Sequence, residues 1–328
     1  MYPAHCGAAQ ETPAAGQVLV TVEPAVEESP VASGPVFATP TTLDRAGRIV
    51  APIEINGRGP FRFILDTGAN RSALSEATAV LLGLAPESGS TVAVHGITGS
   101  AELPVVRVQQ FRAGDLVIEN QQLPVLPAAV FGNTDGILGI DALQDVRIEV
   151  DFEHDTVVIR RSSGRPAAKG YIVVKAKRRH GGLLLVKGKV GSIGVSAILD
   201  TGAERSLGNE VLRAALADRE RRPQAGVATT VIGATEQLVE GTSIWAPDIV
   251  LGTAQVNDLV VTFGDLHVFN VWSLNQEPAL VIGMDLLGTL QRFVVDYRRG
   301  EFHFKVWEGG SSATLCPSIG CRRPARER

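Results

Sequence analysis

Residues 63–69 read Phe-Ile-Leu-Asp-Thr-Gly-Ala, and residues 197–203 repeat this phrase as Ala-Ile-Leu-Asp-Thr-Gly-Ala. Each copy is a hydrophobic run, typical of a buried strand, that ends in a carboxylate, a small hydroxyl residue and a glycine. A single copy is more often an ordinary turn or helix cap, since aspartate and threonine both favour caps. Two copies indicate instead that related halves of the chain bring Asp66 and Asp200 together, and paired carboxylates can activate water.

The similarity between the two halves extends beyond these phrases. Short strands are expected upstream of each phrase at residues 37–43, 49–55 and 61–65, and at 171–177, 183–190 and 195–199. Asn56-Gly57 is a strong signal for a tight hairpin before the first phrase. After each phrase, apolar residues three and four apart predict short helices over 73–82 and 207–216.

A second pair of segments also matches. Residues 136–143 read Gly-Ile-Leu-Gly-Ile-Asp-Ala-Leu, and residues 280–287 read Leu-Val-Ile-Gly-Met-Asp-Leu-Leu. We interpret Asp141 and Asp285 as caps of the short helices that follow. Gly139 and Gly283 are expected to let a neighbouring chain segment pack tightly beneath each Asp-Thr-Gly loop. Self-similarity on this scale indicates duplicated domains.

These four motifs, in this order, resemble the aspartic proteases, and the alanine after Asp-Thr-Gly is similar to the retropepsin-like branch. The resemblance implies a mainly β, bilobal acid-protease fold made of two homologous β-barrel lobes with short helices. It also implies that Asp66 and Asp200, one from each lobe, are the catalytic residues at the floor of a cleft. The implied activity is that of an aspartic endopeptidase, which hydrolyses a peptide or protein substrate without a metal or other cofactor.

The resemblance also sets expected boundaries. They are a flexible leader at 1–35, an N-terminal lobe at 36–160, a linker at 161–170, a C-terminal lobe at 171–307 and a flexible tail at 308–328. Because one polypeptide then holds both aspartates, we expect a monomer. The charged pair that braces retroviral dimers is absent here, since its positions hold Asn70, Glu204, Ile140 and Met284.

The other residues of the two phrases are expected to support the aspartates. Thr67 and Thr201 supply hydroxyls that can bond across the interface between the lobes. Gly68 and Gly202 remove a β-carbon where the backbone must pass close to the aspartates. The alanines that follow, Ala69 and Ala203, keep the floor of the cleft shallow.

A flap over the cleft is expected at residues 91–102. Its candidate residues are His95, Gly96, Ile97, Thr98 and Gly99, with Ile232, Gly233 and Ala234 as the matching segment of the second half. We interpret His95 as a solvated loop residue rather than a substrate contact. No tyrosine lies in this segment, so the flap tyrosine of the pepsin-like enzymes has no counterpart.

Other classes of function find little support. The six histidines show no His-x-x-x-His spacing for a zinc helix, and neither a Gly-x-Ser-x-Gly elbow nor a phosphate loop is present. A net charge of −4 gives a nucleic-acid role no electrostatic basis. Two alternatives to an active protease stay open: a non-catalytic module that holds a peptide in the same cleft, and a zymogen whose leader occupies it.

The ends of the chain bear on localisation. No apolar stretch is long enough for a transmembrane helix, and no hydrophobic core of a signal peptide is visible. Cys316 and Cys321 could close a small disulfide loop in an oxidising compartment, leaving Cys6 unpaired, but free thiols fit equally well. From the leader composition and the habits of the family, we expect a periplasmic or secreted protein.

Overall fold

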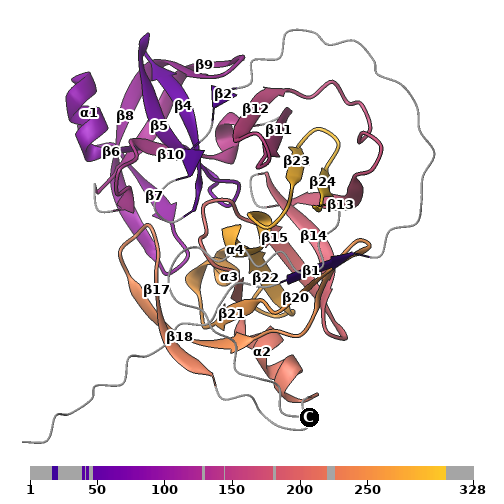
Figure 1. The fold of residues 1–328 in the computed structure, drawn as a ribbon. Coiled ribbons are helices and arrows are strands. Elements are labelled where there is room, and N and C mark those ends of the chain that lie inside the picture. Colours follow the sequence, from indigo (N-terminus) through magenta and orange to yellow (C-terminus); the bar gives the residue numbers. More distant parts are fainter. Residues whose placement is uncertain are drawn as a thin grey trace, which may run out of the picture.

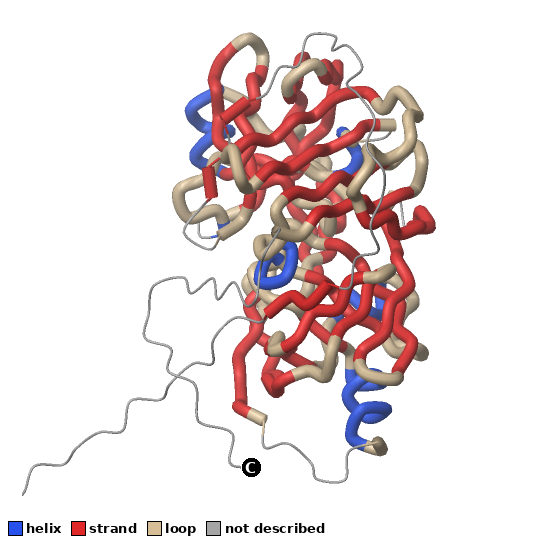
Figure 2. Tube along the Cα trace, turned by 45° about the vertical axis from the view of Figure 1, so that its right-hand side comes forward, coloured by secondary structure: helices blue, strands red, loops and turns tan. Residues whose placement is uncertain are grey.

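The computed structural model describes residues 17–20, 39–40, 42–43, 47–127, 130–143, 145–179, 182–219 and 226–307. Over these residues the protein is mainly β with short helices, which confirms the predicted fold class (Figures 1 and 2). Cys6, Cys316, Cys321, the tail and most of the leader lie outside the described residues. No helix among the described residues is long and apolar enough to cross a membrane.

We call residues 36–160 the first repeat and residues 171–307 the second repeat. Strands of the first repeat form an eight-stranded sheet in the order β3-β4-β5-β10-β6-β9-β8-β7, and an additional β4–β8 pairing closes it on itself. Their bounds are β3 (Thr42–Leu43), β4 (Ile49–Ile55), β5 (Arg58–Leu65), β6 (Ala73–Ser75), β7 (Thr91–His95), β8 (Ser100–Ala113), β9 (Leu116–Leu126) and β10 (Gly136–Leu138).

The second repeat has the same strand order, β13-β14-β15-β22-β16-β21-β18-β17, within a sixteen-stranded sheet. The bounds are β13 (Ile172–Arg179), β14 (Leu183–Val190), β15 (Ile193–Leu199), β16 (Leu207–Gly208), β17 (Val227–Ile232), β18 (Leu238–Trp245), β21 (Val260–Phe263) and β22 (Ala279–Ile282). In each repeat the strand before the aspartate pairs in parallel with its neighbour, β5 with β10 and β15 with β22.

One difference between the repeats lies in the counterpart of the long strand β8. It is broken into β18 and β19 (Ile249–Leu251), with Pro247 in the gap. The neighbouring strand is divided at the same level into β20 (Ala254–Asn257) and β21.

Strands of the two repeats also pair within one sheet. The sixteen-stranded sheet continues from β13 through β24 (Glu301–Lys305), β23 (Arg292–Asp296), β11 (Val146–Asp151), β12 (Thr156–Arg161) and β2 (Thr39–Pro40). The antiparallel pairing of β11 with β23 joins the first repeat to the second by a backbone ladder (Figure 1). The halves are therefore connected by a sheet as well as by the chain between β12 and β13.

The predicted helices begin later than expected. They are α1 (Glu76–Leu82) and α2 (Glu210–Ala217), while residues 73–75 and 207–208 form β6 and β16 instead. Pairing with β10 and β22 overrides the helical periodicity in these residues. Ser75 and Asn209 then cap the helices, since their side-chain oxygens accept hydrogen bonds from backbone N–H groups.

The remaining described elements are short. They are η2 (Ile140–Ala142), α3 (His267–Val271), α4 (Met284–Leu287) and β1 (Gln17–Val20). β1 lies inside the expected flexible leader and pairs antiparallel with β20. A large hydrophobic core runs through both repeats and includes Phe63 of β5 and Ile198 of β15, so each phrase enters its loop from a buried strand.

Candidate active site

Asp66 and Asp200 each follow the last residue of a central strand, β5 or β15. The Asp66 N–H donates to the Leu138 carbonyl at 3.0 Å, and the Asp200 N–H donates to the Ile282 carbonyl at 2.9 Å. The parallel neighbour of each strand thus fixes where the aspartate leaves the sheet. The same strand arrangement, used twice, delivers the two carboxyl groups to one place.

The two carboxyl groups are close enough to interact with each other, since each aspartate packs against the glycine of the other's loop. Asp66 Oδ1 accepts from the N–H groups of Gly68 at 2.9 Å and Ala69 at 2.8 Å. Asp200 Oδ1 accepts in the same way from the N–H groups of Gly202 and Ala203, at 2.9 and 3.0 Å. One oxygen of each carboxyl is therefore held by its own loop, which leaves the other oxygen for the partner carboxyl or for a bound molecule.

The glycines make this close approach possible. A β-carbon placed on Gly68 would lie 2.3 Å from Asp200 Cγ, and one placed on Gly202 would lie 2.3 Å from Asp66 Cγ. Both distances are far below any real carbon–carbon contact, so a side chain at either position would displace the opposite aspartate. Each aspartate thus packs against the glycine of the other repeat.

Burial dominates the electrostatics of the pair. It raises the pKa of Asp66, against the effect of the N–H donors from Gly68 and Ala69. Burial, followed by the negative charge of Asp66, raises the pKa of Asp200 well above its ordinary value. Two carboxylates this close cannot both ionise without a large electrostatic cost, so the pair retains a proton in a pH range where isolated aspartates are ionised.

The two threonines hold the loops together. Thr67 N–H donates to Thr201 Oγ1 and Thr201 N–H donates to Thr67 Oγ1, both at 3.1 Å. Each hydroxyl donates further across the pair, Thr67 Oγ1 to the Leu199 carbonyl at 2.7 Å and Thr201 Oγ1 to the Leu65 carbonyl at 2.6 Å. All of these groups are buried, so the reciprocal bonds fix the separation of the loops.

Asp141 and Asp285 do not cap the short helices, and that prediction is wrong: the capping residues, Gly139 and Gly283, have no side-chain cap bond. Asp141 lies inside the first turn, where its Oδ1 accepts from the Ala142 N–H at 2.9 Å, and the same oxygen accepts from the N–H and hydroxyl of Ser72, at 2.9 and 2.7 Å. Asp285 accepts from Ser206 in the same two ways, at 2.8 and 2.7 Å. The Ser-Asp contact clamps the far end of each Asp-Thr-Gly loop.

The glycines of this second motif lie under the same loops. A β-carbon on Gly139 would lie 2.4 Å from the Arg71 carbonyl carbon, and one on Gly283 would lie 2.6 Å from that of Arg205. The Gly139 and Gly283 N–H groups donate to the serine hydroxyls of the clamp. Tight packing beneath each loop is therefore what these glycines provide.

The flap candidates form the tips of two hairpins, β7–β8 and β17–β18, which approach each other from the two repeats (Figure 1). The contact is reciprocal. A β-carbon on Gly233 would meet Thr98 Oγ1 at 2.6 Å, and one on Gly96 would meet Thr235 Oγ1 at 3.2 Å. Each glycine therefore accommodates the threonine of the opposite tip.

The first hairpin also contacts α3 of the second repeat. The Ile97 carbonyl accepts from the Val268 N–H at 3.2 Å, and His95 Nδ1 lies 3.3 Å from His267 Nε2, at hydrogen-bonding distance. His95 is exposed, as expected for a solvated loop histidine, but its ring also contacts His267. Local sequence gives no signal for His267, because the contact joins residues far apart in the chain.

A cavity of about 630 Å³ lies between the hairpins and the two aspartates. Its lining includes Asp66, Gly68, Ala69, Asp200, Gly202, Ala203, His95, Gly96, Ile97, Ile232, Gly233 and Ala234, while Thr67, Thr201, Thr98, Gly99, Gly139 and Gly283 are not part of it. Much of the remaining surface is apolar and includes Val268, Val271 and Trp272 of the α3 region. Apolar groups of a bound molecule can be buried against this surface.

Sequence reasoning missed several lining residues, among them Arg48, Arg71, Arg205 and Trp272. Arg71 and Arg205 did carry a signal, since both phrases continue to an arginine five residues after the aspartate. Arg48 and Trp272 carry none, because their place at the cavity depends on how distant segments pack.

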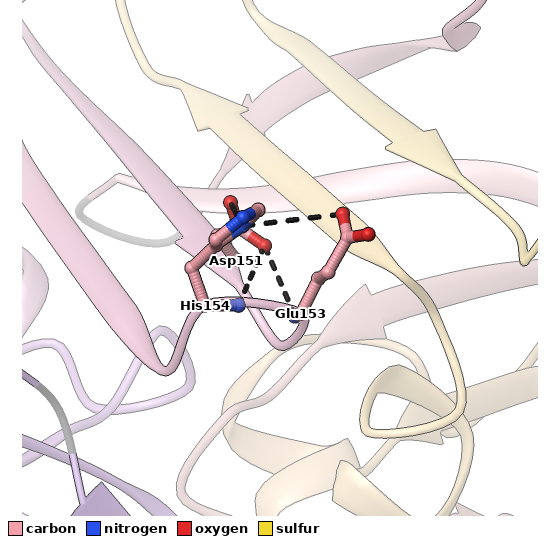
Figure 3. A group of neighbouring side chains, drawn as sticks. All are labelled: Asp151, Glu153 and His154. Atoms are coloured by element: carbon pink, nitrogen blue, oxygen red, sulfur yellow. Dashed lines mark hydrogen bonds and ion pairs between the residues drawn. The ribbon is translucent and has the colours of Figure 1, made fainter.

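A separate group of potential metal ligands lies at the β11–β12 turn. Asp151, Glu153 and His154 offer ligand atoms within 4.8 Å of one another (Figure 3). The Arg292 guanidinium, however, lies 2.9 Å from Asp151 Oδ2 and 3.3 Å from Glu153 Oε2. A cation from the chain itself already neutralises these carboxylates, so the group ties the turn to β23 and is not part of the cavity.

Residues 51–142 match a family model described as aspartyl protease. The matched region includes Asp66 and Gly139 and ends before the second repeat, so it supports an aspartyl protease family and protease function in general terms. No curated protein matches the chain.

Proposed function

We propose that this protein is an aspartic endopeptidase of the retropepsin-like kind, with two lobes that each contribute one aspartate. The observation that carries the proposal is the reciprocal geometry of Asp66 and Asp200: each packs against the glycine of the other's loop, both line one cavity, and burial raises the pKa of each. The lobes correspond to the first and second repeats. Because one chain supplies both carboxyls, a monomer suffices for activity.

The chemistry follows from one proton shared by two carboxyls. The ionised carboxylate accepts a proton from a water bound between them, and the neutral carboxylic acid donates its proton to the carbonyl oxygen of the peptide bond under attack. The tetrahedral species then collapses when the amide nitrogen receives a proton from the carboxyl that took it from water. The C–N bond breaks, and a hydroxyl of the former tetrahedral carbon returns a proton to the other carboxylate as the new carboxyl group forms. The pair is thereby back in its starting state with one proton.

The substrate is a peptide in extended form. The cavity lies beneath two hairpins and over the aspartates, and its apolar lining favours hydrophobic side chains on the substrate. The two hairpin tips, which carry Thr98 and Thr235, contact each other on the far side of the cavity from the aspartates. These hairpins must therefore separate to admit a polypeptide. Hairpin opening is then a step of each catalytic cycle.

The test uses Asp66→Asn and Asp200→Asn, each assayed on a denatured protein substrate across an acid-to-neutral pH series. Each substitution should lower kcat by about a thousandfold or more, because each carboxyl has its own role. Asp115→Asn is the matched control, since Asp115 is exposed in the turn between β8 and β9. Full activity in either aspartate variant would show that other residues carry out the chemistry. Binding of a peptide without cleavage by the wild type would indicate a peptide-binding module.

A further inference from the structure

We propose that Arg71 and Arg205 are specificity-determining residues that select substrates with acidic side chains on both sides of the bond that is cut. This inference rests on the proposed peptidase function and names the substrate class of the same site. Both arginines line the cavity, and both are exposed there. They occupy the same position in the two phrases, so they approach the aspartates from opposite repeats.

The backbone of each arginine is held rigidly. The arginine carbonyls pack against Gly139 and Gly283, and the serines that follow are bonded to Asp141 and Asp285. The charge of Arg71 acts on Asp141 and that of Arg205 acts on Asp285, where each opposes the rise in pKa that burial causes. Neither guanidinium forms a hydrogen bond, or an ion pair within 4 Å, with any other residue that the structure describes. A fixed anchor whose guanidinium N–H groups have no acceptor among the described residues is a preorganised contact for a carboxylate, which guanidinium binds through two parallel hydrogen bonds.

The charge of the cavity favours the same substrates. Apart from the aspartate pair, its lining contains the cations Arg48, Arg71 and Arg205 against the single carboxylate Glu204. The chain as a whole carries a net charge of −4. With one carboxyl of the aspartate pair ionised, the lining has three positive charges against two negative charges, a net charge of +1 that is opposite in sign to that of the whole chain. A cavity with low-dielectric walls concentrates the field of such charges.

The two sides of the cavity are not equal. Arg205 follows Glu204, whereas Arg71 follows the uncharged Asn70. A carboxylate beside the arginine competes electrostatically with an acidic substrate side chain, so the side with Arg71 should have the stronger preference. Glu204→Asn should bring the Arg205 side to the level of the Arg71 side.

The experiment first digests a proteome-derived peptide library and records which residues flank each cleavage. Aspartate and glutamate should be enriched on both sides of the bond. Two quenched fluorescent peptides that differ only by glutamate or glutamine at the most enriched position then give a ratio of kcat/KM. We expect about a fivefold ratio in favour of glutamate, falling at high salt because the contact is exposed.

Variants assign this ratio to the arginines. Arg71→Gln should bring it close to one, Arg71→Glu should invert it, and Arg205→Gln should have a smaller effect. Arg178→Gln removes an equal charge from an exposed part of β13 outside the cavity and should leave the ratio unchanged.

Each possible result has a distinct meaning. Cleavage without acidic enrichment, or a ratio that survives in both arginine variants, overturns this inference while the peptidase proposal stands. Failure of the folded wild type to cut any peptide in the library overturns the peptidase proposal and this inference with it.

Discussion

Gly68→Ala tests whether the close packing of the two loops sets the position of the aspartates. The new β-carbon would lie 2.3 Å from both Cγ and Oδ2 of Asp200, whereas ordinary van der Waals contact begins at 3.4 Å. The Asp200 carboxyl is buried and held by Gly202 and Ala203, so it cannot rotate away freely. The strain must therefore separate the two carboxyls by about 1 Å or distort the loop that carries them.

The magnitude follows from the sensitivity of catalysis to geometry. A misplacement of about 1 Å at a reacting group costs on the order of a hundredfold in rate, or about 2.7 kcal/mol of transition-state stabilisation. We expect kcat for a fluorogenic peptide to fall by about this factor in Gly68→Ala. Gly202→Ala should behave alike, because its β-carbon would meet Asp66 at the same distance.

Gly194→Ala is the matched control for this prediction. Gly194 lies in β15, and a β-carbon there has nothing within 4 Å. The control variant should retain wild-type kcat and wild-type thermal stability. If Gly68→Ala were to fold and keep wild-type kcat, the idea that loop contact positions the aspartates would be refuted.

Three further predictions concern stability. Thr67→Val leaves the buried Thr201 N–H without an acceptor, so we expect a loss of about 3 kcal/mol in urea unfolding, with Thr67→Ser close to wild type; an unchanged midpoint for the valine variant would contradict this. The raised pKa of Asp200 means that its stabilising contribution is complete below its unfolded value of 3.8 and is lost as pH rises through the folded pKa. Asp200→Asn should therefore exceed the wild type in Tm at pH 7 but not at pH 3, and equal Tm values at both would count against burial as the cause. The Arg299 guanidinium donates hydrogen bonds to Glu301 and lowers its pKa to about 2, although burial of Glu301 acts in the opposite direction. The contribution of Glu301 to stability is therefore present above pH 4.5 and is lost as the pH falls towards 2. Glu301→Gln should destabilise the protein at pH 6 and have little effect near pH 2, as followed by circular dichroism melts, and a pH-independent difference would refute this assignment.

Much of the fold is readable from local sequence. The strands expected at 49–55 and 183–190 are β4 and β14 with the same bounds, because their apolar residues and flanking turns are local properties of the chain. The tight hairpin at Asn56-Gly57 is present, with both residues at positive φ. The predicted helices began about one turn too early in the sequence. Residues 73–75 and 207–208 pair with distant strands, and helical periodicity does not reveal that pairing.

The site divides in the same way. The sequence by itself determined that Asp66 and Asp200 end equivalent strands, that Gly68 and Gly202 follow them, and hence that a two-fold arrangement was to be expected. The repeat encodes this, because equal sequences fold into equal local units.

Tertiary structure alone decided the contacts between those units. It placed Ser72 against Asp141, paired His95 with His267, and brought Arg71 and Arg205 to one cavity. These contacts depend on how the two repeats pack against each other through their shared sheet. A pattern of neighbouring residues records which face of a strand is buried, but it does not record which distant side chain will lie against that face.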